Sequence, residues 1–243
     1  MRSMNILLLH PEERVDSHYW RVSGARFRHI TELLERGTGD TLRAGVLNGM
    51  LGSATVKEID HAAQQLLVSF RAEDEPPAPL PLKLILALPR PKMLKRVLID
   101  ASSLGIKQIV LLNSWKVDKS YWQTPHLNAD LLREKLILGL EQAMDTTLPE
   151  LILAPRFKPF VEDELSLFSS GSKKIVAHPG EYPQMPHDIS EPVTLAVGPE
   201  GGWTEYEKEM FESQGFECRA LGQRILRVET ALPTLVGRIM RLI

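Results

Sequence analysis

Two short stretches near the end of the sequence combine residue types that could form a binding or catalytic site. The first is GPEGG, residues 198–202, which follows an apolar run at 193–197 and precedes a glutamate-rich segment with helical spacing. Glycine lets backbone amides approach a ligand closely and lets the chain turn tightly around it. The stretch has neither the spacing of a phosphate-binding loop nor that of a dinucleotide-binding loop. On composition alone, a structural turn is the alternative interpretation.

The second stretch is LGQRILRVET, residues 221–230, which places three charged side chains among apolar residues. These side chains belong to Arg224, Arg227 and Glu229. Burial of such charges without partners is costly, so charged residues in this setting tend to serve a site or to pair with one another. The second stretch therefore favours a functional interpretation of the first.

From Leu82 onward, the sequence alternates between apolar runs of buried-strand type and segments with helical spacing. The expected strands are 82–88, 108–112, 151–154, 174–177, 193–197 and 217–220, and the expected helices are 92–104, 127–144, 161–168, 204–214 and 231–242. This alternation with short links predicts a parallel sheet covered by helices. Thr204 and Glu207 form a capping-box pattern at the start of one helix. The glycine-rich loop then lies at the carboxyl end of a strand, where open α/β sheets bind ligands.

The first part of the chain consists of shorter elements broken by glycine. Segments 41–47, 53–59 and 65–70 alternate like strands, Asn48-Gly49 is a hairpin-turn signal, and 29–36 has helical spacing that ends at Gly37 as a C-terminal cap. These features predict a small β-barrel with one short helix in residues 1–75. The acidic, proline-rich stretch 73–81 predicts an extended connector. A second domain of α/β class is therefore expected at 82–243.

The composition is ordinary for a globular protein, with 43% hydrophobic residues, 25% charged residues and a formal net charge of −2. This charge provides no global basic field for nonspecific binding of nucleic acid. The sequence has no apolar run long enough for a membrane helix and no signal-peptide pattern, so we expect a cytoplasmic protein with no membrane partner. The single cysteine, Cys218, excludes an internal disulfide and argues against a cysteine-based zinc site, and no metal is expected.

A local cluster of cations and aromatic residues occurs near the start of the chain. Its cationic members are Arg14, Arg21, Arg26, Arg28 and His29, which are interleaved with Tyr19, Trp20 and Phe27. Arginine and aromatic side chains together suit phosphate contact and base stacking. The cluster is a candidate RNA-binding surface, and a solvated basic edge is the alternative.

GPEGG followed by LGQRILRVETA, in a chain that starts with a small barrel, resembles the RsmE family of ribosomal RNA uridine-N3 methyltransferases, which belongs to the SPOUT class. The segments RHITELLERGTGDTLRAGVLNG and PRPKMLKRVLIDASSLGIKQIVLLNS are similar to the family's barrel segment and to its first strand-helix-strand unit. The resemblance implies a PUA-like barrel followed by an α/β domain with a deep trefoil knot, a rare exception to the rule against threaded chains. It also implies a homodimer whose site lies near the subunit interface.

The resemblance further implies S-adenosylmethionine as the cofactor and the small ribosomal subunit, through its 16S ribosomal RNA, as the partner. Carried over position by position, the cofactor would be cradled by residues of both loops: Leu195, Val197, Gly198, Glu200, Gly201, Gly202, Leu221, Gly222, Ile225, Leu226 and Thr230. Backbone groups would hold the adenine edge, and apolar side chains would sandwich its ring.

The implied reaction is methylation of uridine N3, an imide nitrogen that must lose its proton before it attacks a sulfonium methyl group. Negative charge then spreads over the two flanking carbonyl oxygens, and a preorganised cation would stabilise it. Arg227 is the first choice for this role and Arg224 the second, with Glu229 orienting a guanidinium. The alternative functions are a SPOUT methyltransferase for another RNA position and a non-catalytic RNA-binding assembly factor.

The chain departs from the resemblance at two places. Asn113-Ser114-Trp115-Lys116 stands where family members commonly have Glu-Arg-Ser, and EQAMD at 141–145 stands where they tend to have Glu-Gln-Ser-Gly-Arg. An arginine is missing at both places. An aromatic and basic cluster follows the first: Trp115, Lys116, Lys119, Tyr121 and Trp122. This cluster would replace cationic contacts by stacking on RNA, and packing on the long helix or across a dimer interface is the alternative.

Overall fold

The computed structural model describes residues 5–241, and these divide into two compact units. The first unit contains the described residues up to Ala78 together with Leu140–Leu148, and the second contains Pro79–Gly139 and the described residues from Pro149 onward. The expected connector at 73–81 begins later than its composition suggests. Strand β5, Gln65–Asp74, includes its first two residues, because Ser53 Oγ and the Arg71 guanidinium both donate to the Glu73 carboxylate within the sheet.

The first unit is built on a five-stranded sheet with the order β1-β3-β4-β5-β2. Its strands are β1 Leu7–Leu9, β2 Tyr19–Ser23, β3 Thr41–Val46, β4 Leu51–Asp60 and β5 Gln65–Asp74. β1 pairs with β3 in parallel, and the other pairs are antiparallel. The alternating side chains of these strands bury a core that includes Trp20, Val56 and Val68. The pairings thus give a mixed sheet with β1 and β2 at its edges. This sheet is compatible with the predicted barrel.

The helical segment of the first unit differs from the prediction at both ends. Helix α1, Gly24–Arg28, starts directly after β2 and continues as a π-turn at His29–Leu33. Gly24 has a φ of 67°, which allows the abrupt change from strand to helix. The expected cap at Gly37 is wrong, because the positive φ of 49° that ends the segment is at Glu35. The helix is anchored instead by buried Phe27 and Ile30.

A segment from the middle of the chain completes the first unit. The hairpin turn between β3 and β4 is confirmed at Asn48, which has a φ of 58°. The Asn48 amide donates to the Thr146 carbonyl oxygen over 2.8 Å, and the Leu148 amide donates to Asn48 Oδ1 over 2.8 Å. Asn5 Nδ2 also donates to the Gln142 carbonyl oxygen over 2.7 Å. These bonds join Leu140–Leu148 to residues about 100 to 137 positions earlier in the chain.

The second unit contains a six-stranded sheet, with the order β11-β9-β10-β6-β7-β8 and all pairs parallel. Its strands are β6 Leu82–Ala87, β7 Gln108–Leu112, β8 Glu150–Ala154, β9 Lys173–Ala177, β10 Val193–Val197 and β11 Glu217–Arg219. β10 lies between β9 and β6, and all five of its residues are buried. This burial on both faces explains why its sequence does not alternate between apolar and polar residues and has Thr194 as its one polar member. The predicted parallel α/β architecture is confirmed.

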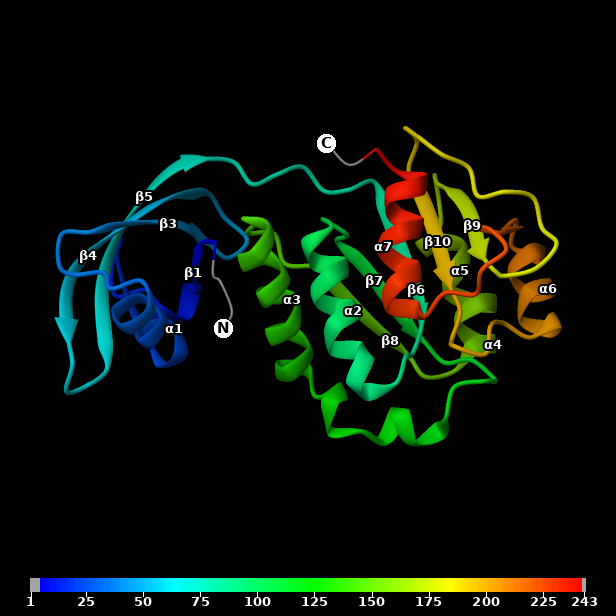
Figure 1. Cartoon of the computed structure of the whole chain (residues 1–243), viewed down its shortest axis with the longest axis horizontal. Coiled ribbons are helices and arrows are strands. Elements are labelled where there is room, and N and C mark those ends of the chain that lie inside the picture. Colours follow the sequence, from blue (N-terminus) through cyan, green and yellow to red (C-terminus); the bar gives the residue numbers. More distant parts are fainter. Residues whose placement is uncertain (1–4, 242–243) are drawn as a thin grey trace. The chain divides into compact units, whose positions relative to one another are not determined.

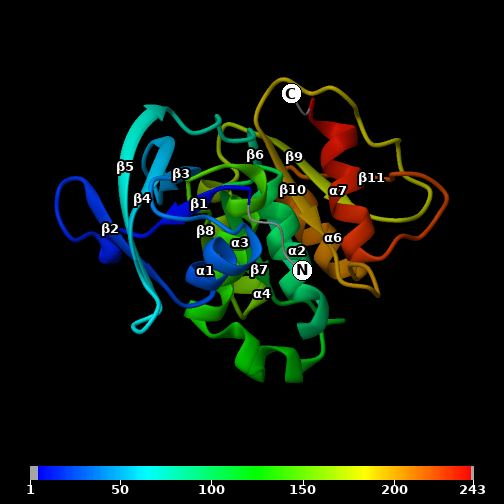
Figure 2. The same cartoon turned by 60° about the vertical axis from the view of Figure 1, so that its left-hand side comes forward.

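Helices cover this sheet, with α2 and α7 on the near side in Figure 1 and α4 and α5 behind the strands. The helices are α2 Pro91–Ser103, α3 Ala129–Ala143, α4 Phe157–Pro159, α5 Leu165–Phe168, α6 Glu205–Ser213 and α7 Val228–Ile239, with a π-turn at Phe160–Glu164 and 3-10 turns at Lys119–Gln123 and Pro125–Leu127. α2 and α7 pack side by side (Figure 2). Among the described residues, no helix combines the length and apolar character needed to cross a membrane.

Two helix boundaries differ from the sequence-based expectation. The helix expected at 161–168 begins at Phe157, because Phe157 packs edge-to-face on Phe211 with ring centroids 5.4 Å apart. The helix expected at 231–242 begins at Val228 and ends at Ile239, while Leu242 lies outside the described residues. Val228 is buried and belongs to the same helical face as the rest of the buried α7 residues. The two charged residues that flank it therefore lie at a helix start rather than in a loop.

Candidate functional site

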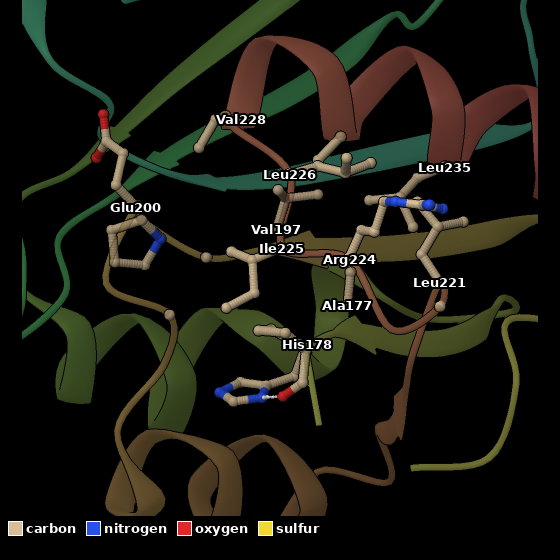
Figure 3. Close-up of a pocket in the computed structure, with 16 residues that line it drawn as sticks. Ala177, His178, Val197, Glu200, Leu221, Arg224, Ile225, Leu226, Val228 and Leu235 are labelled. Atoms are coloured by element: carbon tan, nitrogen blue, oxygen red, sulfur yellow. Dashed lines mark hydrogen bonds between the residues drawn. The ribbon is translucent and has the colours of Figure 1, made fainter. Parts of the chain in front are cut away.

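A pocket in the second unit brings together the two stretches that the sequence singled out. It lies at the carboxyl ends of β9 and β10 and is closed by the loop after β11 and by the first turns of α7 (Figure 3). The pocket encloses about 630 Å³ of space, part of which is open to solvent. Its lining residues are Ala177, His178, Pro179, Val197, Gly198, Pro199, Glu200, Gly202, Leu221, Gly222, Arg224, Ile225, Leu226, Val228, Ala231 and Leu235.

Most of the residues expected to cradle a cofactor lie in this lining, and three do not. Leu195 is fully buried inside β10. Gly201 turns toward Lys116, whose Nζ donates to the Gly201 carbonyl oxygen over 2.8 Å. Thr230 lies in α7, where its carbonyl oxygen accepts a hydrogen bond from Thr234 Oγ1 over 2.7 Å. The remaining eight expected residues converge from two loops that are about twenty positions apart in the sequence.

The three charged residues of the second stretch take different positions. Arg224 lines the pocket with an exposed side chain. Arg227 is the N-cap residue of α7 and is exposed, and Glu229 is half-buried in the first turn of that helix. Arg227 and Glu229 flank Val228, which does line the pocket. The structure thus brings Arg224 into the cavity wall and leaves Arg227 and Glu229 beside it.

The lining also contains residues that the sequence-based reasoning missed. His178 and Pro179 follow β9 directly, at the same edge of the sheet as the loop after β10. The carboxyl ends of neighbouring parallel strands meet at one edge, so the expected strand at 174–177 was the available signal for them. Ala231 and Leu235 come from α7 with the spacing of one helical face. Both residues were expected in the last helix, and neither was assigned to the site.

His178 connects the end of β9 to the glycine-rich loop. Its Nδ1 lies 2.6 Å from the Pro179 carbonyl oxygen, and its Nε2 lies 3.2 Å from the carbonyl oxygen of Trp203. The ring packs edge-to-face on Tyr182, with centroids 5.6 Å apart. Gly202 passes close above the imidazole with a φ of 68°, and an added Cβ there would lie 3.3 Å from His178 Nε2. This position therefore favours glycine for both its conformation and its space.

Lys208 stabilises the part of the pocket wall that contains His178. Its Nζ lies 2.7 Å from Glu205 Oε2 and donates to Tyr182 Oη over 2.5 Å. The hydrogen bond with Glu205, followed by that with Tyr182, raises the pKa of this lysine. A charged Lys208 thus links α6 to the segment that follows His178.

Gly198 is the second position of the loop where a side chain has little room. An added Cβ would lie 3.1 Å from Trp203 Nε1 and 3.2 Å from Trp203 Cδ1. Trp203 is 2% exposed and packs on Phe211, with ring centroids 5.1 Å apart. Because the indole is held in the core, it cannot move aside easily. Gly198 thereby lets the backbone of the loop lie directly on this aromatic core.

The buried carboxylate of Glu207 ties the glycine-rich loop to the loop that follows β7. Glu207 Oε2 accepts hydrogen bonds from the backbone amide and from Oγ1 of Thr204, both over 2.8 Å. This interaction confirms the predicted capping box at the start of α6. Glu207 Oε1 accepts a hydrogen bond from the Trp115 amide over 2.8 Å. One side chain therefore positions two loops at the carboxyl edge of the sheet.

Glu200 does not offer a free carboxylate to the cavity. Its Oε1 pairs with Arg90 Nε at 3.5 Å, and Figure 3 shows its carboxylate directed away from the other labelled side chains. Arg90 precedes α2 directly, so this pair joins the loop after β6 to the loop after β10. Within residues 5–241, no group of three or more His, Cys, Asp or Glu side chains is arranged to hold a metal ion.

In the first unit, the expected RNA-binding residues divide into two kinds. Arg26 pairs with Glu13 and donates to the Leu8 carbonyl oxygen over 2.7 Å. Arg14 donates to the carbonyl oxygens of Asp16 and Ser17 and lies over the Trp20 ring. These two guanidinium groups have roles inside the unit. Arg21 and Arg28 are exposed, and His29 is half-buried.

Comparison with known proteins adds an independent line of evidence. A family model described as an RNA methyltransferase domain matches residues 76–240. A protein named ribosomal RNA small subunit methyltransferase E from Treponema pallidum is 33% identical over 235 residues, which cover 94% of this chain and 87% of that protein. A protein of the same name from Synechocystis is 25% identical, over 98% of this chain and 77% of that protein.

Solved structures show the same fold. The crystal structure of a ribosomal RNA small subunit methyltransferase E from Neisseria gonorrhoeae, bound to S-adenosyl methionine, superposes with a TM-score of 0.75 at 20% identity and covers 96% of both chains. A putative methyltransferase from Legionella pneumophila, in complex with the same cofactor, has a TM-score of 0.73 at 21% identity and the same coverage of both chains. At these identities, the comparison establishes the fold.

Replacement of Glu207 by glutamine tests whether its carboxylate holds the site together. An amide has one acceptor oxygen, so Glu207→Gln would leave either the Trp115 amide or the Thr204 donors without a partner. We expect the free energy of unfolding to fall by about 1–3 kcal/mol. Denaturant unfolding measures this change, with Glu209→Gln on the exposed side of α6 as the matched control. Equal stability of the two variants would contradict the role assigned to Glu207.

Proposed function

The chain belongs to the RNA methyltransferase family that includes ribosomal RNA small subunit methyltransferase E, and we propose that it transfers a methyl group from S-adenosylmethionine to N3 of a uridine in 16S ribosomal RNA. One structural observation carries the proposal. The loops at 198–202 and 221–226, which come from different strands, form two walls of a single pocket at the carboxyl edge of a parallel sheet. That edge is where open α/β sheets bind ligands.

The lining of the pocket has the chemistry that S-adenosylmethionine requires. Apolar side chains of Leu221, Ile225, Leu226 and Leu235 suit the two faces of an adenine ring. Gly198 and Gly202 have no Cβ atoms, so backbone groups of this loop stay open to hydrogen bonds with the edge of the ring, although the Gly202 amide itself donates to the Pro199 carbonyl oxygen over 2.8 Å. When bound, the cofactor supplies a sulfonium methyl group as the electrophile.

The residues of this chain would act on the RNA base rather than on the methyl group. Loss of the N3 proton leaves negative charge on the two flanking uracil oxygens, and a fixed guanidinium beside them stabilises that charge. Arg227 is favoured because its backbone is held as the N-cap of α7, next to Val228 in the pocket wall. Arg224 is the second candidate, since it lines the pocket itself. Glu229 would orient one of these guanidinium groups from the first turn of α7.

We also propose the finer features of the fold and assembly. The second unit would contain a trefoil knot that forms the pocket loops, and the first unit would be a PUA-like barrel that binds RNA through exposed Arg21 and Arg28. The domain boundaries would lie at 1–75 and 82–243. The protein would act as a cytoplasmic homodimer with the site near the subunit interface. The resemblance of the late loops to the RsmE family supports these proposals.

Methyl transfer to isolated small ribosomal subunits, compared with naked 16S ribosomal RNA, tests the proposed function. We expect label from S-adenosylmethionine in the RNA and 3-methyluridine after digestion to nucleosides. A ribose-methylated or otherwise modified nucleoside would favour a SPOUT methyltransferase for another RNA position. RNA binding without binding of S-adenosylmethionine would favour a non-catalytic assembly factor instead.

A bulky residue inside the pocket should block the cofactor. Ala231 lines the cavity from α7, so Ala231→Phe would place a ring in the space assigned to S-adenosylmethionine. We expect affinity for the cofactor, measured by calorimetry, to fall roughly tenfold or more, because overpacking of a formed site is costly. Thr234→Phe, one helical turn further along α7 and exposed, is the matched control. Unchanged affinity in Ala231→Phe would exclude this cavity as the cofactor site.

Removal of the favoured cation should affect chemistry and spare cofactor binding. For Arg227→Ala we expect kcat to fall roughly 100-fold to 1,000-fold, as when one preorganised donor to a developing oxyanion is removed. The affinity for S-adenosylmethionine should stay unchanged. Arg238→Ala, an exposed arginine near the end of α7, serves as the control. If Arg227→Ala binds the cofactor and methylates at the normal rate, Arg227 does not have this role.

A further inference from the structure

The structure separates the members of the aromatic cluster that follows β7. Trp122 is half-buried, and its Nε1 donates to Asn113 Oδ1 over 2.9 Å, so it packs within the chain. Trp115 is different, because its side chain is 87% exposed. The described tryptophans Trp20 and Trp203 are 5% and 2% exposed. A large apolar ring left in water forgoes favourable burial, so Trp115 is the member of the cluster that needs a functional explanation.

The backbone that carries Trp115 is held firmly although its side chain is free. The Trp115 amide donates to the buried Glu207 carboxylate, and the Val117 amide donates to the Ser114 carbonyl oxygen over 3.0 Å, which closes a turn. Ser114 and Val117 are both buried. The turn therefore presents the indole from a fixed position, which lowers the conformational cost of binding a partner.

This turn lies directly against the loop that forms the pocket. Lys116 Nζ donates to the Gly201 carbonyl oxygen, and an added Cβ on Gly201 would lie 2.9 Å from Lys116 Cδ. Gly201 stands between Glu200 and Gly202, which both line the pocket. Trp115 thus projects from the rim of the proposed methyl-transfer site.

The surroundings of the indole are polar and partly cationic. Lys116 and Lys119 follow it in the chain and are exposed, and Arg90 pairs with Glu200 of the same pocket loop. Asp118 turns its carboxylate back to the Ser120 amide at 2.8 Å, which caps the 3-10 turn at Lys119–Gln123. A single flat ring among cations matches an unstacked base on a phosphate chain better than it matches an apolar protein surface.

We propose that Trp115 stacks on an unpaired base of the RNA substrate, next to the nucleotide that enters the pocket. The inference rests on the proposed function for the identity of the RNA, and it assigns to Trp115 a role in substrate positioning. Stacking on a tryptophan tolerates any base, so Trp115 would hold the strand in register with the pocket. The two lysines would contact the adjoining phosphates.

Fluorescence titration of the full chain with a short single-stranded oligouridylate tests this proposal. Trp20 and Trp203 are buried, and Trp122 is half-buried with its Nε1 bonded to Asn113, so we expect RNA-dependent quenching in the native protein to come mainly from Trp115 and to be lost in Trp115→Phe. Trp115→Ala should weaken RNA binding roughly tenfold, Trp115→Phe should retain most of the affinity, and a duplex RNA should quench little. Affinity for S-adenosylmethionine should not change in either variant.

Leu167→Ala is the matched control, because Leu167 is an exposed apolar residue of α5, with 83% exposure, away from the turn that carries Trp115 in the sequence. Unchanged RNA affinity in Trp115→Ala would overturn the proposal, as would a native dimer that dissociates in this variant and thereby shows the indole to be an interface residue. Because these measurements require no catalysis, RNA binding that depends on Trp115 without methyl transfer would refute the proposed function and leave this inference standing.

Discussion

The carboxylate of Glu207 is the interaction on which the candidate site depends. It is 2% exposed and accepts hydrogen bonds from the start of α6 and from the Trp115 amide. A buried charge is tolerated only when its hydrogen-bonding capacity is filled, and here the partners are the backbone amides of Thr204 and Trp115 and the Thr204 hydroxyl. The helix N-terminus adds a favourable field for the negative charge. The same group therefore sets the end of the glycine-rich loop and the rim of the pocket.

Much of the second unit was predictable from its sequence, because its elements depend on local patterns. The central strands are mostly apolar, because both faces of the sheet are covered and all five residues of β10 are buried. The start of α6 was marked by Thr204 and Glu207. The start of α7 was misplaced because Arg227 and Glu229 suggested a loop. Yet the buried face of that helix already begins at Val228, so apolar spacing was the better guide than charge.

The features that escaped prediction depend on contacts between distant parts of the chain. Nothing near Asn48 indicates that its turn will bind the segment around Thr146, about one hundred residues later. The same holds for Arg26, whose pairing with Glu13 only the folded chain reveals. His178 enters the pocket wall because β9 is the neighbour of β10, and strand order is not encoded in the local pattern. The residue types of the two late loops were enough to identify those loops as parts of a site. The lining residues that follow β9 could be assigned only once the strand order was known.

The two sides of the candidate site depend on different properties of the chain. The pocket relies on backbone shape at Gly198 and Gly202 and on the volume that its apolar lining leaves open. The rim relies on the particular side chain at position 115, which is exposed and does not support the core. A change there would alter contacts with the substrate at little cost to the fold. Glu207 anchors both the glycine-rich loop and the turn at Trp115 to α6. A substitution at position 115 would therefore change the side chain at the rim, while the rim keeps its position beside the pocket.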